Sequence, residues 1–374
     1  MSGDAYAAAG VDVAAGDKAV ELMKAAVGRT HGPSVLGGVG GFAGLWDALD
    51  LKGYEHPILA TSTDGVGTKI AIAQAMGVHH TVGLDLVGMV VDDLVVCGAR
   101  PLFMTDYIAT GHVDPVKIAS IVGGIAAGCE ATDTALIGGE TAEHPGVMAP
   151  DEYDIAGAAV GVVDQPRLLG AHRVAAGDVV LALPSSGLHS NGFSLVRAVV
   201  ARLGLPWETP IEEFGRSLGQ EVLEPTRLYA RPCLALAEAL GDGLHAFSHV
   251  TGGGLAANLA RVLPAGLGAV VSRSSWEVPP VFQWLRRVGD VAWASLERTL
   301  NLGVGMVALV TPDAASRAIA VAAGYGLEAV PIGRVASLSE FDAAARAAGA
   351  EAGDIVQGAK GVDGGSVLLT DSYR

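Results

Sequence analysis

The stretch T-S-T-D-G-V-G-T-K at Thr61–Lys69 combines one carboxylate, two glycines, hydroxyl side chains and one ammonium group. A short apolar run before it predicts a strand, and helix-forming residues that end at Gly77 follow it. We therefore expect Asp64 in a strand-to-helix loop of an α/β fold. Backbone N–H groups at such a helix start favour an anion, and a divalent cation on Asp64 would bridge to phosphate oxygens. The stretch predicts a nucleotide site, and a glycine-rich turn capped by Asp64 is the alternative.

Length and composition indicate a globular chain with two domains. The 374 residues are enough for two ordinary domains, each with its own core. Half of the residues are hydrophobic and 17% are charged, which excludes a disordered chain. The 52 glycines indicate many tight turns and close packing contacts.

The charge balance limits the possible partners. The chain has 24 Lys and Arg residues against 40 Asp and Glu residues, a net charge of −16, and no Lys/Arg-rich run. A nucleic-acid partner is therefore not expected. A small anionic substrate must be held locally, by helix N-termini and by single cations such as Lys69 and Arg227.

Localisation signals point to a cytoplasmic protein with no membrane partner. The N-terminus has neither a basic region nor an apolar region, and the most apolar later run is broken by Asp92 and Asp93. The cysteines Cys97, Cys129 and Cys233 are far apart and odd in number, which predicts buried thiols in a reducing compartment.

Two features near the N-terminus involve a helix and a glycine loop. Asp17 is a plausible N-cap for a helix with apolar residues at helical spacing. The loop that follows contains G-x-G-x-x-A at Gly38, Gly40 and Ala43, a variant of the dinucleotide-binding fingerprint. A true fingerprint follows a long buried strand, whereas Gly32-Pro33 lies upstream here, so a nicotinamide site is disfavoured.

Acidic residues in the first half predict a metal site. Asp85, Asp92 and Asp93 fall on one stripe of an otherwise apolar helix, and a buried charge needs a partner. We favour a bound metal over a solvated face. Glu140 follows two glycines on a predicted strand, so Asp64 and Glu140 both lie where open α/β sheets bind ligands.

Two glycine turns in the second half are candidates for binding a phosphate. One contains His189 and Asn191 and the other is Thr251–Gly254; each follows a predicted strand and precedes a predicted helix. Ordinary turn chemistry is the alternative. Histidine is the side chain whose unperturbed pKa suits proton transfer near neutrality, so His189 and His249 are candidates for that role, although a structural role is at least as common for such histidines. No Walker A sequence is present, so the nucleotide site must be of another design.

Many sequence blocks together resemble the phosphoribosylformylglycinamidine cyclo-ligase (aminoimidazole ribonucleotide synthetase) family. The blocks run in the family's order from about residue 6 to 335: Y-A-A-A-G-V-D-V, G-G-F-A-G-L, T-D-G-V-G-T-K, G-L-D-L-V-G-M-V-V-D-D-L-V-V, P-L-F-M-T-D-Y-I-A, G-G-E-T-A-E, Y-D-I-A-G, G-L-H-S-N-G-F-S-L-V-R, P-T-R-L-Y, T-G-G-G-L and N-L-G-V-G-M. So many blocks in register are far more specific than any single motif.

The resemblance implies an architecture and an activity. It implies an α/β fold of α+β type with an ATP-binding and dimerisation domain over 1–164, a substrate domain over 177–337 and an atypical tail with a final strand over 338–374. The N-terminal domains of a homodimer would pair into a β-barrel. The implied reaction uses ATP and Mg²⁺ to convert formylglycinamidine ribonucleotide into aminoimidazole ribonucleotide through a phosphorylated formamide oxygen.

The resemblance also assigns site residues. Lys69, His189 and His249 are the implied catalytic residues, and Asp64, Asp93 and Glu140 are the implied metal ligands. The family usually has Asn at the position of Asp92, so the metal role goes to Asp93 and that of Asp92 stays open. ATP would contact Gly38, Gly40, Gly41, Phe42, Thr63, Asp64, Gly65, Gly67, Thr68, Lys69 and Asp106. The substrate would contact Ser186, Gly187, His189, Ser190, Asn191, Arg227, Thr251, Gly252 and Gly253.

Other ATP-dependent enzymes of the same architecture are the main alternatives. They make selenophosphate, phosphorylate thiamine phosphate or mature hydrogenases. The usual selenophosphate enzyme needs a reactive Cys near its N-terminal glycine loop, whereas the first cysteine here is Cys97. The hydrogenase factor needs a C-terminal Cys, and this chain ends D-S-Y-R. A nicotinamide oxidoreductase and a non-catalytic acidic binding subunit are alternatives from other classes.

Overall fold

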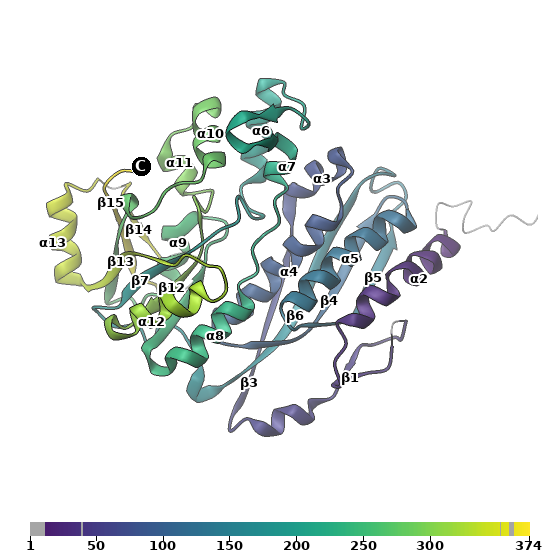
Figure 1. Cartoon of the computed structure of the whole chain (residues 1–374), viewed down its shortest axis with the longest axis horizontal. Helices are drawn as coiled ribbons and strands as arrows, with labels where there is room; N and C mark the ends of the chain where they lie inside the picture. Colours follow the sequence, from purple (N-terminus) through teal and green to yellow (C-terminus); the bar gives the residue numbers. More distant parts are fainter. Residues whose placement is uncertain (1–11, 39, 352, 359–362) are drawn as a thin grey trace, which may run out of the picture. The chain divides into compact units, whose positions relative to one another are not determined.

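The computed structural model describes residues 12–38, 40–351, 353–358 and 363–374 (Figure 1). The Y-A-A-A-G-V-D-V block covers residues 6–13, and its first six residues lie outside the described part of the chain. The described chain forms two compact units, each with its own sheet. Unit 1 contains the residues up to Leu94 and Ala99–Pro166, and unit 2 contains Val95–Gly98 and Arg167–Arg374.

Unit 1 is built on a four-stranded sheet with the strand order β3-β6-β4-β5. Strand β6 is antiparallel to both of its neighbours, and β4 and β5 are parallel. The strands are β3 (Pro57–Gly65), β4 (Arg100–Thr110), β5 (Ala135–Glu143) and β6 (Tyr153–Asp164). A separate two-stranded ribbon consists of β1 (Val35–Leu36) and β2 (Leu45–Trp46).

The helices of unit 1 pack against one face of this sheet (Figure 1). A Cβ on Gly83 would lie 2.4 Å from backbone atoms of the neighbouring helix, so glycine permits this close helix contact. The helical elements are α2 (Val13–Arg29), η1 (Ala48–Gly53), η2 (Gly67–Lys69), α3 (Ile70–Met76), α4 (His80–Val95), α5 (Pro115–Ala131) and, at the boundary with unit 2, η3 (Gln165–Arg167).

Helix caps follow the sequence signals with one correction. Gly77 ends α3 in the left-handed conformation, as the sequence predicts, and Asp114 caps α5. The predicted N-cap Asp17 is wrong, because α2 already begins at Val13. The Asp12 side chain accepts a hydrogen bond from Ala15 N at 3.0 Å and therefore caps the helix.

The two faces of the unit 1 sheet differ in burial. Leu102, Met104 and Ile108 alternate along β4 on the helix-covered face and are buried. The residues between them, such as Thr105 and Tyr107, are exposed on the other face. Leu59 of β3 is also 60% exposed. One face of the sheet is therefore open in the single chain.

Unit 2 is built on a seven-stranded sheet with the order β10-β12-β7-β13-β11-β15-β14. All neighbouring pairs are antiparallel except β11 and β15. The strands are β7 (Val179–Pro184), β10 (Leu244–His249), β11 (Leu267–Ser272), β12 (Val304–Val310), β13 (Val330–Ser337), β14 (Ile355–Gln357) and β15 (Ser366–Thr370). A short hairpin pairs β8 (Pro210–Ile211) with β9 (Arg216–Ser217).

Helices cover both faces of the unit 2 sheet. Val335 and Val367 belong to the large apolar core beneath α9, and the alternate residues Ala336 and Leu368 pack against Phe341 of α13. The helical elements are α6 (Phe193–Leu203), η4 (Glu212–Phe214), α7 (Leu218–Val222), α8 (Ala230–Leu240), η5 (Gly241–Gly243), α9 (Gly254–Arg261), η6 (Arg273–Ser275), α10 (Pro280–Gly289), α11 (Trp293–Glu297), α12 (Pro312–Ala323) and α13 (Leu338–Ala348).

The C-terminal tail contributes structure to unit 2. The final strand expected in this tail is confirmed as β15, and α13 forms the first part of the tail. Strand β15 lies between β11 and β14, so the tail is part of the main sheet. Phe341 occupies space that a side chain at Gly268 would need, since a Cβ there would lie 2.3 Å from the Phe341 ring.

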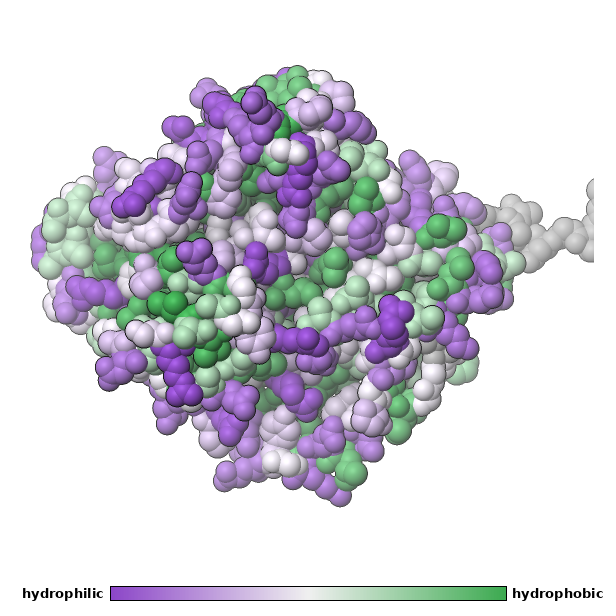
Figure 2. All heavy atoms as spheres, in the orientation of Figure 1, coloured by the Kyte–Doolittle hydropathy of each residue, from purple (hydrophilic) through white to green (hydrophobic). Residues whose placement is uncertain are grey.

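Hydrophilic and hydrophobic residues are intermixed on the face shown in Figure 2, where neither kind forms a continuous band. Within the described part of the chain, no helix is long and apolar enough to cross a membrane.

Candidate active site

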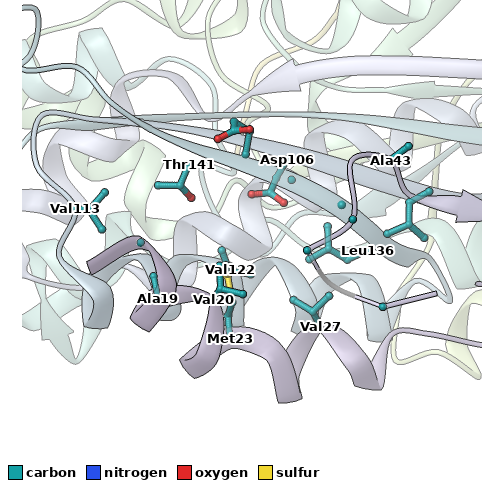
Figure 3. Close-up of a pocket in the computed structure, with 18 residues that line it drawn as sticks. Ala19, Val20, Met23, Val27, Ala43, Asp106, Val113, Val122, Leu136 and Thr141 are labelled. Carbon is teal, nitrogen blue, oxygen red and sulfur yellow. The ribbon is translucent and has the colours of Figure 1, made fainter. Parts of the chain in front are cut away.

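Unit 1 contains a cavity of about 250 Å³. Apolar side chains of α2, including Val20, Met23 and Val27, form one wall, and β4 and β5 form another (Figure 3). Five residues predicted to bind ATP or metal line it: Gly38, Gly40, Gly41, Asp106 and Glu140. The structure thus brings the glycine loop and two acidic residues to one cavity.

Asp106 is the half-buried carboxyl of this cavity. It pairs with Gly157 on one side and with Gly139 on the other. A Cβ on Gly139 would lie 2.3 Å from Asp106 Oδ1, so this glycine makes room for the carboxyl group. Burial raises the pKa of Asp106 to about 7, against the opposing effect of a backbone hydrogen bond. The carboxyl can therefore either donate or accept a hydrogen bond near neutral pH.

Asp64 and Asp106 occupy one row of the sheet. Both pair with Gly157, from opposite sides of β6, so their side chains leave the same face. Two strand spacings separate their Cα atoms by roughly 10 Å. The prediction that Asp64 lies in a loop is wrong, because it is the penultimate residue of β3. Its side chain is exposed and accepts a hydrogen bond from Gly65 N at 2.7 Å.

The three predicted metal ligands are not assembled as a cluster. Asp64, Asp93 and Glu140 are all exposed, and Glu140 lies within β5 instead of at its end. Glu140 pairs with Tyr107, one residue beyond Asp106, so its side chain leaves the opposite face of the strand. Among the residues that the structure describes, no three His, Cys, Asp or Glu side chains form a group that could hold a metal ion.

Lys69 and Asp85 explain part of the acidic stripe. The Lys69 ammonium lies 2.9 Å from the Asp85 carboxylate, and both side chains are fully buried. The cation that faces Asp85 is thus a lysine of the same unit, and the preference for a bound metal at this position is wrong. Asp92 is also fully buried, whereas Asp93 is exposed. Lys69, which we expected to contact ATP, is absent from the cavity lining.

The remaining predicted ATP-contacting residues surround the end of β3 and the glycine loop. Gly67 has a φ of +66°, a conformation that favours glycine, two residues before the buried Lys69. Phe42, Thr63 and Thr68 are exposed. They are accessible to a ligand, but the cavity lining does not include them.

The first glycine turn of unit 2 runs from Ser185 to Gly192 and leads into α6. Ser186 N donates a hydrogen bond to His189 Nε2 at 3.2 Å. His189 has a φ of +59° and is 1% exposed, with its ring against Tyr229. Because Nε2 accepts this bond, it carries no proton, and the imidazole is neutral in this arrangement. This hydrogen bond stabilises the turn. Because the ring is buried, His189 is not a solvent-accessible general base in this structure.

The second glycine turn leads into α9. Gly253 and Gly254 both have positive φ angles, which explains the glycine run. The buried side chain of Asn258 donates to Gly254 O at 2.8 Å and to Thr251 O at 3.3 Å. Asn258 is not among the residues predicted from the sequence. The one feature that could have indicated its role is a polar amide side chain in the first turns of a largely apolar helix. His249 ends β10 and is 5% exposed.

The two turns are neighbours in unit 2. A Cβ on Gly252 would lie 3.4 Å from Asn191 Oδ1. The residues predicted to bind substrate therefore come from two segments that meet, although these are about 60 positions apart in the sequence. Two helix starts that adjoin in this way form a suitable environment for an anion, because the N-terminus of a helix carries a partial positive charge.

Arg227 adds a positive charge on a segment joined to the first turn. Ser186 Oγ donates to Pro225 O at 2.6 Å, and the hydroxyls of Ser190 and Thr226 are 3.0 Å apart. Arg227 is half-buried, and its Nε has no hydrogen-bond partner among the described residues. A guanidinium with spare donors beside two glycine turns can bind a phosphate.

Comparisons with known proteins agree across both units. Residues 48–163 match the family described as "AIR synthase related protein, N-terminal domain", and residues 175–343 match the corresponding C-terminal domain. The chain is 52% identical over 336 residues to a protein of Sorangium cellulosum (strain So ce56) named phosphoribosylformylglycinamidine cyclo-ligase. That match covers 90% of this chain and 96% of the relative.

Solved structures show the same fold at low sequence identity. Thiamine-monophosphate kinase from Stenotrophomonas maltophilia K279a superposes with a TM-score of 0.63 at 20% identity, covering 96% of this chain and 97% of that one. The hydrogenase maturation protein HypE, in a complex with ATP, superposes with a TM-score of 0.56 at 20% identity. That match covers 85% of this chain and 86% of that one.

Proposed function

The chain belongs to the phosphoribosylformylglycinamidine cyclo-ligase family, and from that premise we propose that it closes the imidazole ring of aminoimidazole ribonucleotide in purine biosynthesis. The substrates are formylglycinamidine ribonucleotide and ATP. The products are aminoimidazole ribonucleotide, ADP and phosphate. The identity of 52% across 90% of the chain supports this activity. In this proposal, unit 1 binds ATP and unit 2 binds the ribose phosphate of the substrate.

ATP binds in unit 1, in the cavity between α2, the glycine loop and the strands β4 and β5. The apolar wall of α2 suits a flat base, and the backbone of Gly38, Gly40 and Gly41 can approach a ligand closely. Asp106 supplies a hydrogen-bonding carboxyl group in the same cavity. The HypE structure of the same fold was solved with ATP, which supports a nucleotide in this architecture.

Mg²⁺ would be held through exposed carboxylates and ATP phosphates. Magnesium usually takes one or two protein carboxylates and completes its shell with phosphate oxygens and water, so a preformed three-residue cage is not required. Asp64 at the end of β3 and Glu140 beside the cavity leave opposite faces of the sheet, so each is a separate candidate for that role, and Asp93 stays a third. When bound, the ion would neutralise charge on the transferred phosphoryl group.

The ribose phosphate of formylglycinamidine ribonucleotide binds in unit 2. Backbone N–H groups of the turns around Ser186–Asn191 and Thr251–Gly253 surround it, and Arg227 neutralises its charge. A net charge of −16 makes such a local anion site necessary. The spare donor of Arg227 beside the joined turns is the structural observation that carries this assignment.

The proposed reaction has two steps, phosphorylation of the formamide oxygen and closure of the ring. The formamide oxygen attacks the γ-phosphorus of ATP, the bond to the bridging oxygen breaks, and ADP leaves. The amidine nitrogen then attacks the former formyl carbon, the C–O bond to the phosphoryl group breaks, and phosphate leaves with loss of a proton from nitrogen. The protein mainly positions the two substrates and stabilises developing charge. Lys69, His189 and His249 are buried, so any catalytic role for them must act through their neighbours.

A homodimer completes the proposal. The open face of the unit 1 sheet exposes Leu59 and Tyr107, and a second copy would bury it by forming a β-barrel. A cytoplasmic location agrees with cysteines that are not joined by disulfide bonds, namely Cys97, Cys129 and Cys233.

The deciding experiment measures turnover. The purified protein is incubated with Mg-ATP and formylglycinamidine ribonucleotide, and ADP and aminoimidazole ribonucleotide are quantified together. Equal amounts of both products support the proposal. Thiamine phosphate in place of the ribonucleotide is the comparison substrate, and turnover with thiamine phosphate alone would overturn the proposal in favour of a kinase.

A further inference from the structure

A single segment of unit 2 lies against both glycine turns. We call Glu297–Gly303, which joins α11 to β12, the support segment. A Cβ on Gly254 of the second turn would lie 1.7 Å from Glu297 O. A Cβ on Gly192, which ends the first turn, would lie 2.3 Å from Leu300 Cδ2. Both turns therefore pack closely against the support segment, and glycine is required at both contacts.

Asn301 is the polar link from the support segment to the first turn. Its side chain is buried, at 3% exposure for the residue, and Nδ2 donates to Gly187 O at 2.9 Å. Oδ1 accepts from Gly303 N at 2.9 Å and lies 3.2 Å from Ser185 Oγ. The Asn301 side chain thus bonds to the first turn through Nδ2 and to the support segment through Oδ1. A buried amide bonded in this way fixes the distance between two backbones.

The other end of the support segment is tied to the C-terminal tail. Arg273 Nε donates to Glu297 Oε1 at 2.5 Å, and its Nη2 donates to Asp354 Oδ1 at 3.0 Å. Arg273 Nη1 also donates to Leu369 O at 2.9 Å. Arg273 therefore joins Glu297 to two parts of the tail. Tyr373 adds packing contacts with the rings of Trp276 and Trp293.

We propose that the support segment sets the relative position of the two glycine turns, with Asn301 as the positioning residue for the first turn and Arg273, held by the tail, for the second. The inference rests on the proposed role of these turns in holding the ribose phosphate. Anion binding by several backbone N–H groups depends on their convergence, so a small shift of one turn weakens binding of the phosphate. Asp354 and Leu369 of the tail thereby act on substrate affinity through Arg273, without contacting the substrate.

Asn301→Asp is the main test, because it keeps the shape of the side chain and removes the donor to Gly187 O. The carboxylate would also repel that carbonyl oxygen. We expect KM for formylglycinamidine ribonucleotide to rise about tenfold, as loss of one buried hydrogen bond allows, with KM for ATP within about twofold. Arg273→Lys keeps the charge but loses the fork that joins Glu297 to Asp354, and should raise the same KM.

A matched control separates positioning from general destabilisation. Phe341→Leu weakens the small apolar cluster of α13, which includes Ala336 and Leu368 and neither turn. It should lower the melting temperature and leave both KM values unchanged. Equal changes in both KM values for Asn301→Asp, or the same KM change in Phe341→Leu, would overturn the proposal.

Hydrogen–deuterium exchange gives a readout that does not depend on the reaction. Amides in peptides covering 185–192 should exchange faster in Asn301→Asp than in the wild type, and should be unchanged in Phe341→Leu. Unchanged exchange in Asn301→Asp would overturn the proposal even if the protein were not a cyclo-ligase. Should Asn301→Asp fail to fold, Ser185→Ala removes the hydroxyl that donates to Asn301 Oδ1 at 3.2 Å and to Gly187 O at 2.9 Å, and it should show a smaller change in the same direction. No change in that folded variant would equally overturn the proposal.

Discussion

Lys69 Nζ lies 2.9 Å from the carboxylate of Asp85, and neither side chain is accessible to solvent. The pair joins the segment after β3 to α4. Lys69 is the last residue of the stretch predicted to form the nucleotide site, and Asp85 lies in α4. Two opposite charges buried together are tolerated because each compensates the other, whereas one charge left alone is costly. The pair therefore fixes the end of β3, and with it the position of Asp64.

Removing one member of this pair should destabilise unit 1. Asp85→Leu leaves the Lys69 ammonium buried without that partner, and we expect a loss of about 3–5 kcal/mol in the free energy of unfolding. The double variant Lys69→Met with Asp85→Leu should recover much of the loss. Chemical denaturation of the three proteins measures the difference, and a double variant less stable than Asp85→Leu would contradict the explanation. Turnover by a folded double variant would exclude a catalytic role for Lys69.

Asp64→Asn should abolish ATP turnover and leave the fold intact. The side chain is exposed, so its charge contributes little to stability, whereas an amide binds Mg²⁺ far less well than a carboxylate. Melting temperature, activity and stabilisation by Mg-ADP are measured together. Asp93→Asn, also exposed, shows whether the α4 carboxylate shares the role. Full activity in Asp64→Asn would refute the assignment of Asp64 to the metal.

Asp106 should make the protein less stable as the pH rises towards neutrality. Burial raises its pKa from 3.8 to about 7. Between these values the folded state binds more protons than the unfolded state, so stability is present below pH 4 and is lost as pH rises through 7. Asp106→Asn should remove this dependence. Melting curves between pH 5 and 8 test it, and parallel curves for wild type and variant would contradict the raised pKa.

Arg227→Gln should weaken binding of formylglycinamidine ribonucleotide much more than binding of ATP. A charged hydrogen bond to phosphate contributes about 1.5–3 kcal/mol, so KM for the ribonucleotide should rise roughly ten- to hundredfold. Arg334→Gln is the matched control, because Arg334 is an exposed arginine of the same unit whose ion pair with Glu340 is long, at 3.8 Å. The readout is steady-state kinetics with each substrate varied in turn. An effect on ATP alone would place the phosphate site elsewhere.

Asn191→Ala should act in the same direction as Arg227→Gln but more weakly. The Asn191 side chain lies where the first turn meets Gly252 of the second, so its loss should loosen the junction of the turns. We expect a several-fold rise in KM for the ribonucleotide, consistent with one neutral hydrogen bond. Kinetics with both substrates measure it, and a melting temperature as low as that of a core variant would point to a structural role instead.

The amino-acid sequence by itself determined the local elements and the family. Asp114 and Gly77 mark helix ends because capping depends on residues only a few positions apart. The glycines of both turns are required by positive φ angles, which are also a local property. The order of the sequence blocks is sufficient to identify the family.

The tertiary structure alone decided which distant groups meet. The cation beside Asp85 is Lys69, the pKa of Asp106 depends on what buries it, and the two glycine turns adjoin at Asn191 and Gly252. Asn301 became significant only through its bond to Gly187 O, 114 positions away. Burial and long-range hydrogen bonds arise from how the elements pack, and helical periodicity, caps and turn residues carry information only about neighbours along the chain.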